Sequence, residues 1–198
     1  MSWHIGVPLA RVAGRVFPVR RRGPKLPRGP VVVAANHFSH LDPVLIGLTV
    51  GRPVRYLAVD ELYGNSRLFD RLTQWLGAIP MSRTRAPLGA LKTALAELAH
   101  GGSVGLFPEG VRVWTWGEVP PKRGAAWLAR RAGVPLVPVA IAGSQEALGR
   151  GTARVARVPM TVTVCDPIDP VDHEGDDAAA VMTKVWEDRI GSALAGVG

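Results

Sequence analysis

Hydrophobic residues along the chain fall into two kinds of pattern, short continuous runs and longer segments with a helical repeat. Val31–Ala35 contains five apolar residues in succession, which is typical of a strand that is buried on both faces of a parallel sheet. In Pro87–His100 the leucines recur at steps of three and four residues, which places them on one helix face. Gly101 follows this repeat and suits a helix C-terminus.

The same two patterns alternate over most of the sequence. The expected strands are Val31–Ala35, Val54–Val59, Ala78–Met81, Ser103–Phe107, Pro135–Ala142 and Pro159–Cys165. The expected helices are Pro43–Val50, Ser66–Leu76, Pro87–His100, Gly124–Ala132 and Ala178–Leu194. This alternation predicts an α/β fold with a mostly parallel central sheet flanked by helices, in which functional sites gather beyond the carboxyl ends of the strands.

The expected elements occupy residues 30–198, which we interpret as one domain preceded by an N-terminal segment, residues 1–29. The chain has 198 residues, 47% of them apolar, enough for a core that buries roughly 70% of the unfolded surface. The longest uncharged apolar stretches, Pro43–Gly51 and Val134–Ser144, are shorter than the ~20 residues that a helix needs to cross a bilayer. We therefore expect no spanning helix.

The N-terminal segment combines a helical stripe with basic charge. Leu9, Val12 and Val16 share one helix face, whereas Arg11 and Arg15 are displaced to another. The Pro/Gly-rich connector that follows carries a basic cluster, Arg20, Arg21, Arg22, Lys25 and Arg28. This pattern predicts a short amphipathic helix that binds an anionic membrane surface. In the alternative interpretation the segment packs on the domain and its arginines are solvated.

Net charge and cysteine content narrow the partners and the compartment. The net charge of +8 indicates a polyanionic partner. The sequence lacks the alternation of basic and stacking aromatic residues that would favour nucleic acid as this partner. The start of the chain lacks the uninterrupted apolar run of a secretory signal, so we expect a peripheral protein on the cytoplasmic face of the cell membrane.

The single cysteine, Cys165, excludes an intramolecular disulfide. It is expected to be a buried strand residue, because nothing near it in sequence would activate a thiol.

The most informative polar residues directly follow the first expected strand. His37 comes after Asn36, and Asp42 follows five residues later, just before Pro43. Positions i and i+5 lie about 140° apart on a helix, so the two side chains can meet only across a turn. Pro43 suits the first position of a helix. Because histidine titrates near neutral pH, a carboxylate beside it makes this pair a candidate general base and orienting acid.

Two other interpretations use the same residues. Asp42 can simply cap the helix that begins at Pro43, with His37 a polar residue at a strand end. Alternatively, His37, His40 and Asp42 can ligate zinc, but three ligands crowded on one short turn suit this metal poorly. We therefore expect no metal site.

Three further segments, taken with Asn36–Asp42, resemble the sequence blocks of one family. They are Gly77–Arg83, Phe107–Arg112 and Val137–Val139. In this order they are similar to the four blocks of the glycerolipid acyltransferases typified by 1-acylglycerol-3-phosphate acyltransferase. The resemblance covers the chain from Asn36 to Gly143 and implies the family's α/β fold.

The resemblance implies an O-acyltransferase that forms phosphatidic acid in phospholipid biosynthesis. In the family, a histidine takes the proton of the free hydroxyl of 1-acylglycerol-3-phosphate, which attacks the thioester of acyl-CoA or acyl carrier protein without an acyl-enzyme. By this resemblance His37 is the catalytic base and Asp42 its partner. The acyl donor is a co-substrate, and no cofactor is expected.

The same resemblance assigns the substrate-binding residues. Arg83 and Arg112 are expected to bind the phosphate of the lysophospholipid acceptor. Glu109 and Gly110 are expected at the acceptor site, where Glu109 contacts the glycerol part or orders the arginines. Lys122 precedes a helix and is expected to contact the acceptor phosphate or CoA.

The sequence departs from the family pattern in the third block. Val111 and Val113 stand where the family usually has Thr and often Ser, so two hydroxyl groups are lost. The alternatives are therefore an acyltransferase for another lysolipid or a glycolipid, or a catalytically weak lipid- or membrane-binding protein of the same fold. Trp114 and Trp116 lie in a loop, where they are expected to meet a membrane interface, line an acyl channel or pack against the protein.

Overall fold

The computed structural model describes residues 18–59, 77–82, 88–149, 151 and 155–197. These residues form a seven-stranded sheet with the strand order β1-β7-β6-β2-β5-β3-β4. The strands are β1 (Val19–Arg22), β2 (Val31–Ala35), β3 (Arg55–Val59), β4 (Ile79–Met81), β5 (Ser103–Leu106), β6 (Leu136–Ala142) and β7 (Met160–Val164). Neighbouring strands are parallel except β6 and β7, which are antiparallel. The expected α/β fold with a mostly parallel sheet is confirmed.

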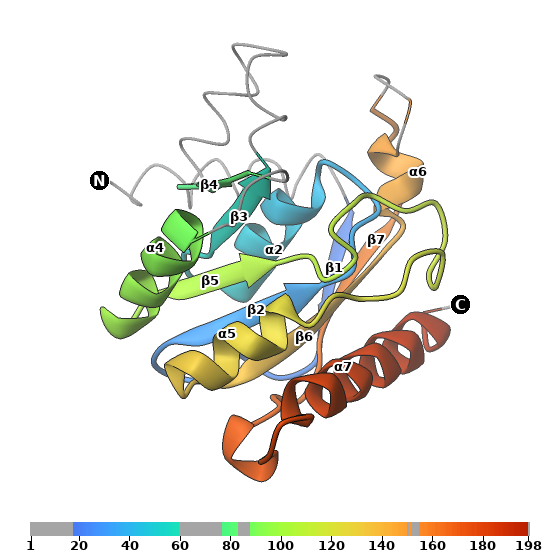
Figure 1. Ribbon diagram of the computed structural model, residues 1–198. Helices are drawn as coiled ribbons and strands as arrows, with labels where there is room; N and C mark the ends of the chain where they lie inside the picture. The colour runs from blue at the N-terminus through green and yellow to red at the C-terminus, as the bar shows by residue number, and fades with distance from the viewer. Residues whose placement is uncertain (1–17, 60–76, 83–87, 150, 152–154, 198) are drawn as a thin grey trace.

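Helices cover both faces of the sheet (Figure 1). They are α2 (Asp42–Val50), α4 (Leu88–Ala99), α5 (Gly124–Ala132), α6 (Ser144–Leu148) and α7 (Ala178–Ala195), with a 3₁₀ turn η2 (Pro170–Asp172) before α7. Buried residues of α4, α5 and α7 form one core on one face, and α2 contributes to a second core on the other face. Among the described residues, no helix has the length and apolar character required to cross a membrane.

Strand β2 lies near the middle of the sheet, between β6 and β5, and its residues are completely buried. Val32 and Ala34 point into the core under α4, α5 and α7, whereas Val31, Val33 and Ala35 point into the core under α2. Successive side chains of a strand alternate between the two faces of a sheet. A strand that is covered on both faces therefore needs the continuous apolar run that the sequence shows.

The expected strands from β2 to β7 and the expected helices α2, α4, α5 and α7 are present with ends shifted by at most one residue. The strand β1 was not predicted, because its residues 20–22 belong to the expected basic connector. It pairs with β7 at the edge of the sheet, so this part of the N-terminal segment lies in the same sheet as the expected domain. The expected amphipathic helix before residue 18 and the expected helix Ser66–Leu76 lie outside the described residues.

Candidate active site

The end of β2 is clamped to β6 by a buried asparagine. The side chain of Asn36 donates to the carbonyl oxygen of Ile141 at 2.9 Å and accepts from its backbone N–H at 2.7 Å. Asn36 has no exposed surface, so this pair of hydrogen bonds satisfies polar groups that would otherwise be unpaired in the interior. The clamp fixes the place where the chain leaves the sheet and His37 begins a turn.

His37 and Asp42 meet across this turn, as their spacing predicts. The Nδ1 atom of His37 lies 2.8 Å from Oδ2 of Asp42, whose side chain is completely buried. The same Oδ2 accepts from the backbone N–H groups of Phe38 at 2.8 Å and Ser39 at 2.7 Å. The carboxylate thus holds both the turn and the imidazole.

The helix-cap interpretation of Asp42 is wrong. Leu41 is the N-cap residue of α2, no side chain forms a cap hydrogen bond, and Asp42 is the first residue of the helix. Because Nδ1 of His37 faces the carboxylate, the neutral imidazole keeps its proton on Nδ1 and leaves Nε2 free to accept one. The His37 side chain is 16% exposed, so a small substrate group can reach it.

Glu109 lies behind the His37 turn rather than on an open surface. Its Oε2 atom accepts from the backbone N–H of His37 at 2.7 Å, and the residue is 2% exposed. Burial raises the pKa of Glu109 to about 8; the negative charges of Asp42 and Glu118 also raise it, and the His37 N–H opposes them. Glu109 was expected to contact the acceptor or to order the arginines. The structure shows it bound to the backbone of His37.

Aromatic rings support the imidazole from the adjacent strands. The His37 ring stacks on Phe107 at a centroid distance of 4.0 Å, and Phe107 stacks on Tyr56 at 5.3 Å. Tyr56 lies over Gly105, where an added Cβ would come within 2.3 Å of its ring. Burial, followed by the charge of Asp42, raises the pKa of Tyr56 well above its ordinary value. Sequence reasoning missed this support, because nothing in the local pattern around Tyr56 distinguishes it from other core residues.

The segment between β5 and α5, which we call the 107–123 loop, carries the other predicted residues except Arg83. Gly110 has a φ of +70°, and an added Cβ there would lie 3.0 Å from Nζ of Lys122. The backbone N–H of Lys122 donates to the carbonyl of Pro108 at 2.8 Å. Glycine is therefore required at position 110 for its backbone conformation and for the close approach of Lys122. These contacts bring the two ends of the loop together.

Arg112 contributes to the electrostatics of the His37 turn through His40. Burial lowers the pKa of His40 to about 4, and the positive charges of Arg112 and then His37 lower it further, against the charge of Asp42. His40 is therefore neutral near pH 7.

No group of three His, Cys, Asp or Glu side chains in the described part of the chain is arranged to hold a metal ion. Arg83 lies outside the described residues.

The departure at Val113 has a structural explanation. Val113 is 1% exposed, and its backbone N–H donates to the carbonyl of His37 at 2.9 Å. A side chain at this position enters the protein interior, where a hydroxyl would need a partner. Val111 is only partly buried.

The two tryptophans of the loop have different surroundings. Trp114 is 54% exposed, whereas Trp116 packs against the core, with its ring 5.6 Å from that of Trp186 in an edge-to-face contact. Trp116 therefore packs against the protein, which was one of the three expectations for this loop.

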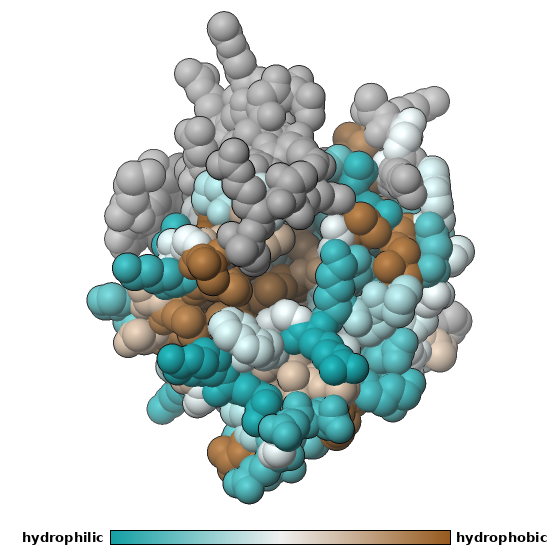
Figure 2. Space-filling model, in the orientation of Figure 1, coloured by the Kyte–Doolittle hydropathy of each residue, from teal (hydrophilic) through white to brown (hydrophobic). Residues whose placement is uncertain are grey.

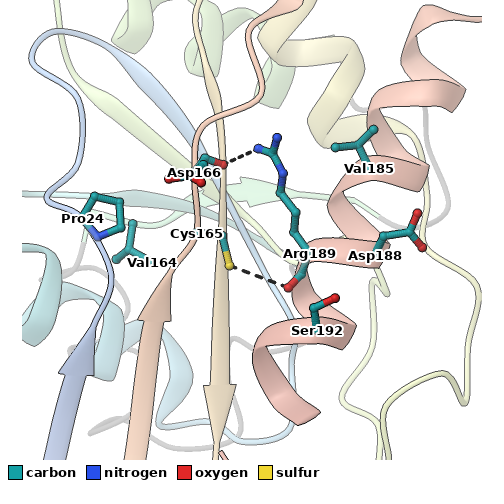
Figure 3. Close-up of a pocket in the computed structure, with 8 residues that line it drawn as sticks. All are labelled: Pro24, Val164, Cys165, Asp166, Val185, Asp188, Arg189 and Ser192. Atoms are coloured by element: carbon teal, nitrogen blue, oxygen red, sulfur yellow. Dashed lines mark hydrogen bonds between the residues drawn. The ribbon is translucent and has the colours of Figure 1, made fainter. Parts of the chain in front are cut away.

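A pocket of about 460 Å³ lies between α7 and the end of β7 (Figure 3). It is lined by Pro24, Val164, Cys165, Asp166, Val185, Asp188, Arg189 and Ser192 and includes none of the predicted site residues. The Cys165 thiol donates to the carbonyl of Arg189 at 3.8 Å, and burial raises its pKa. A raised pKa opposes thiolate formation, so Cys165 is a poor nucleophile and the pocket is not the candidate active site.

The comparisons with known proteins agree with this geometry. A family model described as Acyltransferase matches residues 18–142. The 1-acyl-sn-glycerol-3-phosphate acyltransferase of Bacillus subtilis is 29% identical over 163 residues, which cover 80% of this chain and 78% of that protein. The alpha enzyme of the same name from Bos taurus is 31% identical over 168 residues, but the match covers only 56% of its length and 80% of this chain.

A solved structure shows the same fold. The 1-acyl-sn-glycerophosphate (LPA) acyltransferase from Thermotoga maritima superimposes with a TM-score of 0.79 over 98% of this chain and 78% of its own, at 23% identity. The family model spans the chain from the residue before β1 to the last residue of β6 and includes the His37 turn and the whole 107–123 loop. The chain therefore belongs to the acyltransferase family.

Proposed function

We propose that the protein transfers an acyl chain from an acyl thioester to the free hydroxyl of 1-acylglycerol-3-phosphate, forming phosphatidic acid. The observation that carries this proposal is the 2.8 Å contact between Nδ1 of His37 and the buried carboxylate of Asp42. This contact leaves Nε2 of His37 to act as the base. Hydrogen bonds hold the turn that carries His37 on both sides. The names of the relatives from Bacillus subtilis and Bos taurus support the reaction.

The reaction proceeds by general base catalysis. Nε2 of His37 takes the proton of the acceptor hydroxyl while its oxygen attacks the thioester carbonyl. The tetrahedral intermediate then collapses, the carbon–sulfur bond breaks, and the imidazolium returns the proton to the departing thiolate. Asp42 stabilises the imidazolium. General base catalysis of this kind contributes typically about 10²–10⁴-fold to the rate.

The phosphate of the acceptor is bound by cationic side chains of the 107–123 loop. Lys122 lies over Gly110 and two residues before the start of α5, and Arg112 lies close enough to His40 to affect its pKa. A guanidinium group suits phosphate because its planar N–H groups donate to two oxygens at once. Arg83 completes this set by resemblance to the family.

Apolar surface on the same side of the sheet as α4 supports a lipid substrate. Leu57, Met81, Leu95 and Leu106 are only partly buried there, and Figure 2 shows apolar surface around a hollow on this face. The donor is acyl-CoA or acyl carrier protein, which share the thioester. The N-terminal segment holds the protein at the anionic surface of the cell membrane, on its cytoplasmic face.

A second candidate function is acyl transfer to another lysolipid or to a glycolipid. Val111 favours it, because this partly buried valine beside Arg112 lacks the hydroxyl that the family usually places there. The two candidates differ only in the acceptor.

Thiol release from palmitoyl-CoA, measured with and without lysophosphatidic acid, tests the proposal. We expect release that depends on the acceptor and is abolished by His37→Ala, with folding and vesicle binding unchanged. His100→Ala is the matched control, because His100 is an exposed histidine at the end of α4, and it should retain full activity. Release with a glycolipid or another lysolipid alone would favour the second acceptor. Activity that survives in His37→Ala would overturn the mechanism.

A further inference from the structure

The middle of the 107–123 loop is anchored to α7 by Trp116. The ring of Trp116 meets that of Trp186 edge to face, with centroids 5.6 Å apart and an angle of 60° between the planes. On the same helix, an added Cβ at Gly191 would lie 3.3 Å from Nε1 of Trp116. The absence of a side chain at position 191 therefore leaves room for the indole. Aromatic pairs favour this edge-to-face arrangement.

Trp186 extends this contact to the strand that carries the catalytic turn. It is 1% exposed, and its indole N–H donates to the carbonyl of Ala34 at 2.9 Å. Ala34 belongs to β2 and lies three residues before His37. The loop, α7 and β2 are thus connected through two tryptophan rings.

The loop carries cationic residues on both sides of Trp116. Arg112 comes four residues before it and Lys122 six residues after it. Two backbone hydrogen bonds hold the loop. The N–H of Val113 donates to the carbonyl of His37, and the N–H of Lys122 donates to the carbonyl of Pro108. Between these ties, Trp116 is the loop side chain that packs on the core under α7. The turn around it is fixed separately by Glu118, which accepts from the N–H of Trp114 at 2.7 Å.

We propose that Trp116 is a positioning residue, whose docking on Trp186 and α7 fixes the 107–123 loop so that Arg112 and Lys122 are held in place to bind the anionic group of the acceptor. This inference rests on the proposed transfer to a phosphate-bearing acceptor. Trp116 does not touch the substrate. It acts through the two cations, whose contacts with the phosphate are the same in the ground state and the transition state. Loss of such uniform binding raises KM without lowering kcat.

Steady-state kinetics with lysophosphatidic acid separates this role from a general loss of folding. We expect Trp116→Ala to raise the KM for the acceptor roughly 10- to 100-fold, because losing well-placed charge-assisted hydrogen bonds to a phosphate weakens binding by about one to two orders of magnitude, while kcat is kept. Trp116→Phe retains an aromatic edge against Trp186 and should recover most of the affinity. Gly191→Leu displaces the Trp116 ring from the helix side and should reproduce the high KM even if Trp116→Ala folds poorly.

Trp127→Ala is the matched control, since Trp127 is a 42% exposed indole on α5, and it should leave KM unchanged. A fall in kcat at constant KM, or equal KM values in Trp116→Ala and the wild-type protein, would overturn the proposal.

Amide hydrogen exchange tests the docking even if lysophosphatidic acid is not the acceptor. In Trp116→Ala and in Gly191→Leu the N–H groups of Val113 and Lys122 should exchange faster, whereas those of β6 keep their protection. Unchanged exchange at both amides would refute the docking role. If these amides exchange faster in the variants but the protein does not turn over lysophosphatidic acid, the proposed function is wrong and the docking role of Trp116 stands.

Discussion

Replacing Glu109 with glutamine should remove the pH dependence that this buried carboxyl gives to folding. Burial raises the pKa of Glu109 from its ordinary value of 4.5 to about 8. The folded protein therefore holds this proton more tightly than the unfolded chain does, and its stability falls as the pH rises from 4.5 to 8. Each pH unit between the two values is worth about 1.4 kcal/mol, so the loss is roughly 5 kcal/mol.

Glu109→Gln removes this loss because an amide does not ionise. Its oxygen can still accept from the His37 N–H, but its buried NH₂ group lacks a ready partner, which costs about 1–3 kcal/mol at every pH. We therefore expect the variant to be about 0.3–2 kcal/mol less stable than the wild type near pH 5, and about 2–4 kcal/mol more stable near pH 9. The two stability curves should cross between these values.

Denaturant unfolding followed by tryptophan fluorescence, at several values between pH 5 and pH 9, measures this difference. Glu146→Gln is the control, because Glu146 is exposed on α6, and its difference from the wild type should vary little with pH. A difference for Glu109→Gln that is also constant from pH 5 to pH 9 would refute the reasoning. It would mean that Glu109 is ionised in the folded protein through this whole range.

Three further predictions concern the same turn and its support. Asp42→Asn should lower kcat by about 10⁴-fold, the size of effect seen when a catalytic histidine loses its orienting carboxylate; a loss under tenfold in the thiol-release assay would argue against this role. His40→Gln should reduce the acid sensitivity of the melting temperature, because the lowered pKa of His40 makes folding less favourable as the pH falls from 6.5 toward 4; equal Tm losses between pH 7 and pH 4.5 in both proteins would contradict this. Gly105→Ala should destabilise the protein by about 1–3 kcal/mol, since the new Cβ overlaps the Tyr56 ring; an unchanged unfolding midpoint would show that the ring stack yields at no cost.

The strands that sequence reasoning identified are the ones whose own residues signal burial. β2 and β6 are apolar almost throughout and occupy the middle of the sheet. β1 has one apolar residue followed by three arginines, and it becomes a strand only because β7 offers a free edge with which it pairs. No local pattern reveals such pairing, since the partner lies about 140 residues away in the sequence.

The sequence by itself predicted that the side chains of His37 and Asp42 meet, which the structure confirms. His37 and Asp42 are five residues apart, and the end of a strand followed by the start of a helix brings them together within one turn. The order of the four sequence blocks also identified the family. These are local features, which short-range geometry and residue type are sufficient to specify.

Only the tertiary structure decided what holds this pair. It brought Glu109 to the backbone of His37, 72 residues away along the chain, and Trp186 to Ala34, 152 residues away. It also turned Trp116 inward and left Trp114 exposed, although the two lie two positions apart in one loop. The physical reason is that a carboxyl or an indole has a role only in relation to its neighbours in space, and packing of the sheet against α7 and the 107–123 loop supplies those neighbours.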